Sequence, residues 1–234
     1  MSEQLLTEAL PGEPATFYWS LAQPEGLVLG FSQKPEVLNR AFLAEHPLPI
    51  YHRRAGGTAV LVGPNLLSLD VALPAGHPLL LADLVESYRW LGEAWVETLA
   101  AFGIMARAVS PAEAHAQRDL LKQEKQSGGP AYESLLRRAC YGSLSPYEVV
   151  IGQQKVVGLD MIRRRAGSLL QAGVLLQWET EKLALLLGHT EEEQAILRQG
   201  LPTRACGLNT LLPRPITPAE LITAFERVVR ALLM

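Results

Sequence analysis

The sequence predicts a mixed α/β protein (α+β type) with a mixed, mostly antiparallel sheet flanked by helices. Three observations lead to this prediction. Apolar runs of strand length alternate with glycine- and proline-containing turns in the first third of the chain. Two later apolar runs surround Gly152-Gln153-Gln154, which is typical of a β-hairpin. Longer stretches carry apolar residues three and four positions apart, as in helices that pack one face on a sheet.

Strands are predicted where Val, Leu, Ile and aromatic residues gather in short runs bounded by turn residues. The earliest of them is the aromatic stretch Ala15 to Leu21. The predicted strands are 15–21, 26–31, 48–52, 58–62, 66–73, 104–109, 147–151, 155–161 and 169–177.

Helices are predicted from apolar spacing together with capping residues. The longest carries one apolar stripe, formed by Leu84, Tyr88, Leu91, Trp95 and Leu99. Ser110 with Glu113 fits a capping box, and Pro218 suits the first position of the last helix. The predicted helices are 35–45, 79–102, 110–126, 132–139, 179–187, 190–199 and one that begins at Thr217.

The chain is predicted to form one domain preceded by an arm. Residues 1–14 contain Pro11, Gly12 and Pro14 and are expected to form an N-terminal arm. No internal repeat or linker divides the remainder, so residues 15–234 are predicted to be a single domain with a helical C-terminal region, 178–234.

Composition narrows the range of functions. The chain has 234 residues, 48% of them hydrophobic and 19% charged, which is typical of a globular protein. The net charge of −3 argues against a general nucleic-acid binder. No apolar run reaches the ~18–20 residues of a membrane span, and the first residues lack the features of a secretory signal. We therefore expect a cytoplasmic protein with neither nucleic acid nor membrane as partner.

Cysteines and histidines are too few for a disulfide framework or a zinc site. Cys140 and Cys206 are the two cysteines, and the five histidines are scattered. No metal site is predicted, and Cys206 is expected to be structural.

The segment 53–57 is the first candidate for binding. Paired glycines, Gly56 and Gly57, let backbone N–H groups approach an anionic or carbonyl ligand. The adjacent Arg53 and Arg54 suit a phosphate or carboxylate. The simpler interpretation is a two-glycine turn beside surface arginines.

Cys140 and Lys155 are the candidates for catalysis. Cys140 follows Arg137 and Arg138, and basic neighbours favour the thiolate form of a cysteine. A thiolate can accept an acyl group from one thioester and pass it on, since the intermediate is itself a thioester. The Lys155 ammonium is suited to polarise the acyl carbonyl. The alternative is a buried structural cysteine and a solvated lysine.

Arg163, Arg164 and Arg165 give the strongest local positive charge in the chain. A solvated loop is one interpretation. The other is a docking patch for an acidic partner, because complementary charge steers association.

The order of these segments resembles the lipoate–protein ligase and octanoyltransferase family, whose catalytic domain is related to biotin protein ligase. Residues 53–57 match its Arg-Arg-x-x-Gly-Gly-type turn, and 152–158 match its lysine hairpin with Lys155 as the lysine. Residues 169–176 match its Leu-Leu-Gln-His-Gly strand. Residues 140–148 match the Cys-Phe-x-x-x-Ser-x-Tyr-Glu segment of the branch that uses a cysteine.

The resemblance implies a biotin/lipoate ligase-like catalytic domain in which Lys155 contacts the acyl carbonyl. It implies that the Arg–Gly–Gly loop, with Gly158 and Gly173, lines the same pocket. In the cysteine branch the thiol takes octanoyl from acyl carrier protein and delivers it to a lysine of a lipoyl-carrier domain. Both carriers are typically acidic, which suits the three arginines.

The sequence departs from the family pattern at several positions. Val62 stands where the family has a histidine after the glycine turn, and Ala172 replaces the later one. Asp160 introduces a charge where the family has Ser-Ala-Gln. The hairpin has one extra residue, and a shift of one residue flips side chains between faces unless the turn absorbs it.

Three functional interpretations stay open. The first is an acyltransferase that moves octanoyl or lipoyl between carriers through a Cys140 thioester, with no cofactor. The second is an ATP-dependent lipoate–protein ligase without the accessory C-terminal domain, which would need ATP and Mg. The third is a non-catalytic homologue that binds a lipoyl carrier. All three predict an apolar acyl tunnel between the sheet and the long helix 79–102.

Overall fold

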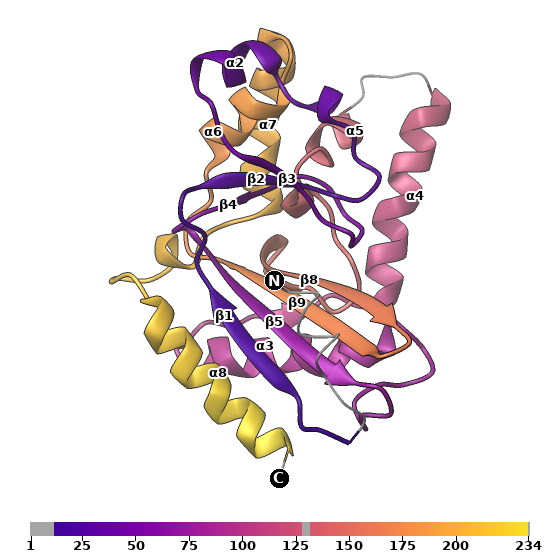
Figure 1. Ribbon diagram of the computed structural model, residues 1–234. Coiled ribbons are helices and arrows are strands. Elements are labelled where there is room, and N and C mark those ends of the chain that lie inside the picture. Colours follow the sequence, from indigo (N-terminus) through magenta and orange to yellow (C-terminus); the bar gives the residue numbers. More distant parts are fainter. Residues whose placement is uncertain (1–11, 128–131, 234) are drawn as a thin grey trace.

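A computed structural model describes residues 12–127 and 132–233 (Figure 1). Most of the predicted arm, residues 1–11, lies outside the described residues. The strands are β1 Thr16–Ser20, β2 Gly26–Leu29, β3 Ile50–His52, β4 Val60–Val62, β5 Leu66–Pro74, β6 Arg107–Ala108, β7 Val149–Ile151, β8 Gln154–Arg164 and β9 Gly167–Leu175. The α-helices are α2 Arg40–Glu45, α3 Arg89–Ala100, α4 Pro111–Ser127, α5 Tyr132–Leu136, α6 Thr180–Leu187, α7 Glu191–Arg204 and α8 Pro218–Leu233. Short 3₁₀ turns are η1 Pro35–Val37, η2 Glu86–Tyr88, η3 Cys140–Gly142 and η4 Leu208–Thr210.

Two sheets organise the molecule. The larger has six strands in the order β1-β5-β9-β8-β7-β6, and every neighbouring pair in it is antiparallel. The smaller has the order β3-β2-β4, with β2 parallel to β3 and antiparallel to β4. This arrangement confirms the predicted fold class of a mixed, mostly antiparallel sheet flanked by helices.

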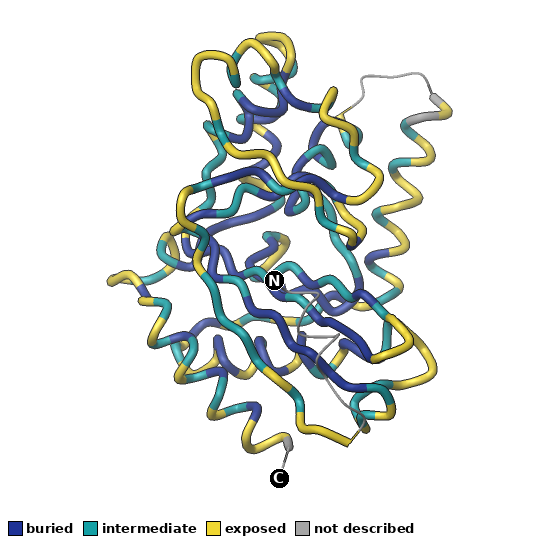
Figure 2. The backbone as a smooth tube through the Cα atoms, in the orientation of Figure 1, coloured by how far each residue is buried: buried dark blue, intermediate teal, exposed yellow. Residues whose placement is uncertain are grey.

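One face of the larger sheet is covered by α3 and α8 (Figure 1). The core on this side contains Trp95, Phe225 and alternate residues of β5, such as Leu67 and Leu69. The ring centroids of Trp95 and Phe225 lie 4.4 Å apart, and Trp19 of β1 packs edge-on against both. Figure 2 shows the central strands of this sheet buried along most of their length.

A second core lies under the smaller sheet. Leu27 and Leu29 of β2 pack with leucines of α5, α6 and α7, among them Leu136, Leu183 and Leu197. The C-terminal helices begin as predicted, because the Thr190 side chain caps α7 by accepting from the Glu193 N–H, and Pro218 is the first residue of α8.

The long helix predicted over 79–102 is shorter than expected. Asp83 Oδ1 accepts from the N–H groups of Val85 and Glu86 at 2.7 and 3.1 Å, and Ser87 Oγ contacts the Leu81 and Asp83 carbonyls. Side chains of this kind compete with the helix for backbone groups. The regular helix therefore starts only at Arg89, and Leu84 is 44% exposed instead of joining the apolar stripe.

The predicted helix 35–45 is also interrupted. Asn39 caps α2 by accepting from the Phe42 N–H, so the segment divides into η1 and α2. At the other end of the chain, β8 continues through Arg163 and Arg164, and β9 pairs back from Gly167. The arginine segment is therefore the end of a β-hairpin. No helix within 12–127 and 132–233 has the length and apolarity to cross a membrane.

Candidate functional site

A cavity of about 610 Å³ lies against the face of the larger sheet that α3 and α8 do not cover. Its walls come from both sheets: Val28 of β2 and Val60 of β4 on one side, and β5, β8 and β9 on the other. The acyl tunnel predicted between the sheet and the long helix is therefore wrong in its placement. Large side chains such as Trp95 and Phe225 already fill that side.

Strand alternation decides which residues face the cavity. Leu66, Ser68 and Asp70 of β5 line it, while the residues between them pack in the core. Gly158 pairs with Gly173, and Asp160 pairs with Gln171, across β8 and β9. The cavity floor consequently has no side chains at the two glycines and an apolar one at Leu66. It is polar along the row Asp70, Gln171 and Asp160, where Gln171 Nε2 donates to Asp70 Oδ1 at 2.6 Å.

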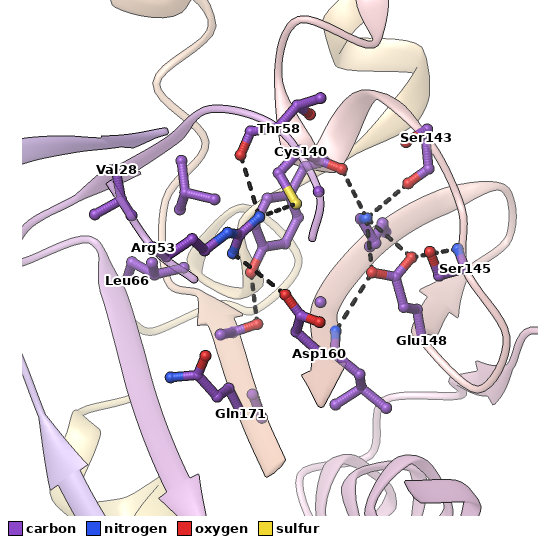
Figure 3. Close-up of a pocket in the computed structure, with 18 of the residues that line it drawn as sticks. Val28, Arg53, Thr58, Leu66, Cys140, Ser143, Ser145, Glu148, Asp160 and Gln171 are labelled. Carbon is purple, nitrogen blue, oxygen red and sulfur yellow. Dashed lines mark hydrogen bonds and ion pairs between the residues drawn. The ribbon is translucent and has the colours of Figure 1, made fainter. Parts of the chain in front are cut away.

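Cys140 and Arg53 meet in this cavity (Figure 3). Arg53 Nη2 lies 3.4 Å from Cys140 Sγ and 3.2 Å from the Thr58 carbonyl oxygen. Arg53 Nη1 lies 3.9 Å from Asp160 Oδ2. One guanidinium thus joins a thiol from η3 to a carboxylate from β8, and a cation at this distance stabilises negative charge on sulfur.

The charges around Arg53 affect its protonation and that of Asp160. Burial would lower the pKa of Arg53, but the Cys140 thiol and the Asp160 carboxylate outweigh burial and raise it. Burial raises the pKa of Asp160, and the Arg53 guanidinium and the Met161 N–H oppose that rise. Asp160, which departs from the family pattern, therefore adds a carboxylate to the cavity, and the Arg53 guanidinium balances its charge.

Lys155 lines the same cavity but its ammonium is engaged elsewhere. Nζ donates to both Glu148 carboxylate oxygens at 2.9 and 3.0 Å, and to the carbonyl oxygens of Cys140 and Ser143 at 2.9 and 2.6 Å. Burial raises the pKa of Glu148, while Lys155 and the N–H groups of Ser145 and Leu159 oppose the rise. Lys155 therefore fixes the backbone at Cys140, and Arg53 contacts the sulfur.

A β-bulge explains how Lys155 reaches the cavity despite the extra hairpin residue. The register of β7 with β8 steps by one between Val149, which pairs with Val157, and Val150, which pairs with Lys155. Val156 is the residue left over, and both Val156 and Val157 pack in the core of the α3 and α8 side. Because two successive residues share one face, Lys155 is turned to the other.

The two glycines of the 53–57 turn differ. Gly57 lines the cavity with φ of +88°, and a Cβ there would lie 2.3 Å from Arg53 Nη2. Only glycine combines that backbone conformation with such a close approach. Gly56 has no heavy atom within 4 Å of the corresponding position, and Arg54 is exposed and outside the cavity wall.

Gly158 and Gly173 lie beneath the ring of Tyr141, a residue that the sequence reasoning did not single out. Tyr141 Oη donates to the Gly173 carbonyl oxygen at 2.6 Å, and a Cβ on Gly173 would lie 2.7 Å from Oη. Burial raises the pKa of Tyr141 well above its usual range. These glycines make room for Tyr141 at the cavity floor.

The basic residues near the site have separate surroundings. Arg163 Nη2 donates to Leu81 O and Ser87 Oγ at 2.8 and 2.7 Å, so Arg163 ties β8 to the loop before α3. Arg164 and Arg165 are exposed at the hairpin end. Arg138, predicted to influence the thiol, instead pairs with Glu193 at 2.5 Å.

Several cavity residues were missed from the sequence. Arg118 lies in the predicted helix 110–126 without any motif of its own, and neither Gln171 nor Asp70 was singled out as a site residue. Arg137, by contrast, was noted as a neighbour of Cys140 and does line the wall. A nucleophilic thiol beside a cation, in a cavity with apolar and polar walls, can accept and release an acyl group.

Comparisons with known proteins find octanoyltransferases among the relatives of this chain. The octanoyltransferase LipM of Lysinibacillus sphaericus is 27% identical over 206 residues, spanning 87% of this chain and 70% of that protein. The octanoyltransferase LipM of an Exiguobacterium species is 27% identical over 217 residues, spanning 92% and 73%.

Solved structures share the fold at low sequence identity. A bi-partite lipoate protein ligase from Thermoplasma acidophilum, studied with its E2 lipoyl domain, superposes with a TM-score of 0.74 at 16% identity, covering 99% of this chain and 76% of that one. A lipoate-protein ligase A bound with ATP gives 0.70 at 15% identity, covering 99% and 78%. The family model of the lipoyl protein ligase A/B catalytic domain matches residues 1–230. The chain belongs to this family.

Proposed function

We propose that this protein is an octanoyltransferase of protein lipoylation and that Cys140 carries the octanoyl group as a thioester. The family membership and the similarity to octanoyltransferases support an acyltransferase. The single observation that carries the assignment of the nucleophile is the 3.4 Å contact between Arg53 Nη2 and Cys140 Sγ inside the cavity.

In the first half-reaction the Cys140 thiolate attacks the carbonyl carbon of an octanoyl thioester. A new carbon–sulfur bond forms to Cys140, the bond to the donor sulfur breaks, and the donor leaves as a thiolate that takes up a proton. The intermediate is a thioester of similar energy to the donor, so the step is close to balanced. Arg53 stabilises the attacking sulfur, and Asp160 holds Arg53.

In the second half-reaction a lysine amine of a lipoyl-carrier domain attacks the Cys140 thioester. An amide bond forms, the carbon–sulfur bond breaks, the amine loses a proton and Cys140 returns to the thiolate. The acceptor is thus a lipoyl-carrier protein, and we infer that the donor is an octanoyl acyl carrier protein. Arg164 and Arg165, exposed at the end of the β8–β9 hairpin, suit the acidic surface of either carrier.

Lys155 has a positioning role in this proposal. It donates to the Cys140 carbonyl oxygen at 2.9 Å and so orients the backbone of the nucleophile. Polarising an acyl carbonyl would require its ammonium to leave one of four acceptor atoms.

Transfer between thioesters needs no cofactor, because the donor bond is already activated. ATP and Mg would enter only if the chain activated a free acid. ATP is named with one structural relative, the lipoate-protein ligase A bound with ATP, whose 15% identity supports the fold alone.

The first test follows the acyl group. Incubation with octanoyl-carrier protein should add one octanoyl mass to the protein, detected by intact mass spectrometry. Cys140→Ala should remove the adduct, and Cys206→Ala should keep it, because Cys206 packs in the core of the other face.

Other outcomes would select other functions. Lipoate-dependent ATP–pyrophosphate exchange that survives Cys140→Ala would indicate a ligase. Carrier binding without adduct or exchange would indicate a non-catalytic homologue.

A second test addresses Arg53 through the glycine turn. In Gly57→Ala the added Cβ would lie 2.3 Å from Arg53 Nη2 and should displace the guanidinium, whereas at 3.5 Å from Cys140 Sγ it makes only an ordinary contact with the sulfur. Alkylation of Cys140 by iodoacetamide at neutral pH should therefore slow. Gly56→Ala is the matched control, since its added Cβ meets no heavy atom within 4 Å. Equal alkylation rates in the two variants would remove Arg53 as the partner of the thiol.

A further inference from the structure

Two arginines of the cavity wall are not explained by the transfer step. Arg118 comes from α4 and is exposed, and Arg137 follows α5 and is half-buried. Among the described residues, no hydrogen bond or ion pair is made by either guanidinium. Their neighbours are engaged elsewhere: Asp119 with Lys122, and Glu133 with Arg204.

The two guanidinium groups repel each other. Burial, followed by the positive charge of Arg118, lowers the pKa of Arg137, and Glu133 opposes this only in part. Two like charges that face one cavity are unfavourable without a negative charge between them. A bound anion would reverse the sign of that interaction and gain charge-assisted hydrogen bonds.

Their position fits one part of the acyl donor. Arg137 precedes Cys140 by three positions, so their Cα atoms lie at most about 11 Å apart. A carrier presents its acyl group on a flexible phosphopantetheine arm, which has a thioester at one end and a phosphodiester toward the carrier. Arg118 lines the same cavity as Cys140 and is exposed to solvent, so an arm that carries its thioester to Cys140 can pass beside Arg118 on its way to the carrier.

We propose that Arg118 and Arg137 form a phosphate subsite that binds the phosphodiester of the donor's phosphopantetheine arm. This inference rests on the proposed function and adds to it how the donor is recognised. The subsite distinguishes donor from acceptor, since an acceptor lysine carries no phosphate.

The experiment compares two small donors that differ only in phosphate, octanoyl-pantetheine and octanoyl-4′-phosphopantetheine. Initial rates of Cys140 acylation are followed by intact mass spectrometry. The protein should prefer the phosphorylated donor by about tenfold or more, as expected for charge-assisted hydrogen bonds to one anion. Arg118→Gln with Arg137→Gln should abolish the preference, so the readout is the ratio of the two rates, in which any change at the thiol common to both donors cancels.

The matched control is Arg227→Gln with Arg230→Gln. It removes the same charge from α8, which covers the opposite face of the sheet. This control should keep the preference. Arg137→Lys should retain part of it, because an ammonium still binds phosphate as a point charge.

Each remaining outcome overturns the inference in a distinguishable way. Equal rates with both donors in the unmodified protein, or an equal loss of both rates in the double variant, would refute the subsite and leave the proposed function standing. Acylation by octanoyl-carrier protein alone would place donor recognition on the carrier's own surface. Loss of ATP–pyrophosphate exchange in the double variant, with the donor preference intact, would assign the anion site to a nucleotide. No adduct from any donor would refute the proposed function itself.

Discussion

The two faces of the six-stranded sheet are made by the same strands and differ in almost every other respect. Toward α3 and α8, β5 presents leucine and valine against Trp95 and Phe225, and the space is filled. Toward the smaller sheet, the alternate residues of β5 are Leu66, Ser68 and Asp70, and a cavity of about 610 Å³ remains.

This difference shows how one strand provides stability and a site at once. The filled face gains from burial of apolar area, which scales with the size of each side chain. The cavity face uses glycines where Tyr141 must approach, and polar residues that need partners across strands. Substitutions on the first face should change stability most, and those on the second should change chemistry as well as stability.

The largest expected effect is on the filled face. Trp95→Ala should lower the free energy of unfolding by about 4 kcal/mol, because Trp95 is fully buried between two other rings. Gln171→Ala on the cavity face should cost about 2 kcal/mol, because buried Asp70 loses a hydrogen bond to its carboxyl group. Urea unfolding of both variants measures the difference, and equal losses would contradict the division of roles between the faces.

A smaller loss of stability is expected at the ion pair between Lys155 and Glu148. Among the described residues, it is the one fully buried ion pair in the cavity wall. Lys155→Met should cost about 3 kcal/mol, because the Glu148 carboxylate would stay buried without its cation. Adding Glu148→Gln should recover part of the loss, since the unpaired charge is then removed. Urea unfolding provides the test. Unchanged stability in Lys155→Met would mean that the ammonium is not a structural clamp.

The smallest effect is a difference in reactivity that leaves stability untouched. Burial raises the pKa of Cys206 to about 11, so this thiol on the filled face stays protonated until the pH approaches that value. At pH 8, iodoacetamide should therefore label Cys140 and spare Cys206, as read from peptide masses. In Cys140→Ser, labelling of the folded protein should rise only above about pH 10. Equal labelling of both thiols at pH 8 would show that the two faces do not differ in this way.

Local pattern was sufficient for most elements of the fold. The hairpin around Gly152 and the helix beginning at Pro218 depend on turn residues and caps that are neighbours in sequence. The prediction of one long helix over 79–102 was wrong because Asp83 and Ser87 form hydrogen bonds with backbone groups of this segment. The spacing of apolar residues alone does not reveal this local competition. The predicted position of the acyl tunnel was wrong for another reason. The spacing of apolar residues does not show which face of the sheet the bulky residues of α8, distant in sequence, will cover.

The site was predicted in its parts but not in its connections. Cys140, Lys155, Gly57 and Arg53 were all singled out, and all line the cavity. The partner of the thiol was expected from its neighbours in sequence, whereas Arg53 lies 87 positions away. Arg118 had no signal, because an exposed arginine on a polar helix looks the same whether or not a cavity opens beside it.

The bulge at Val156 has a consequence for the length of the hairpin loop. A residue inserted near the tip is absorbed within one strand before it reaches Gly158, so the loop tolerates changes in length while the far end of the strand keeps its alignment. Alternation counted back from Gly158 would put Lys155 on the core face, and the bulge at Val156 returns it to the cavity face. Which way the lysine points is therefore decided inside the strand and not at the bend.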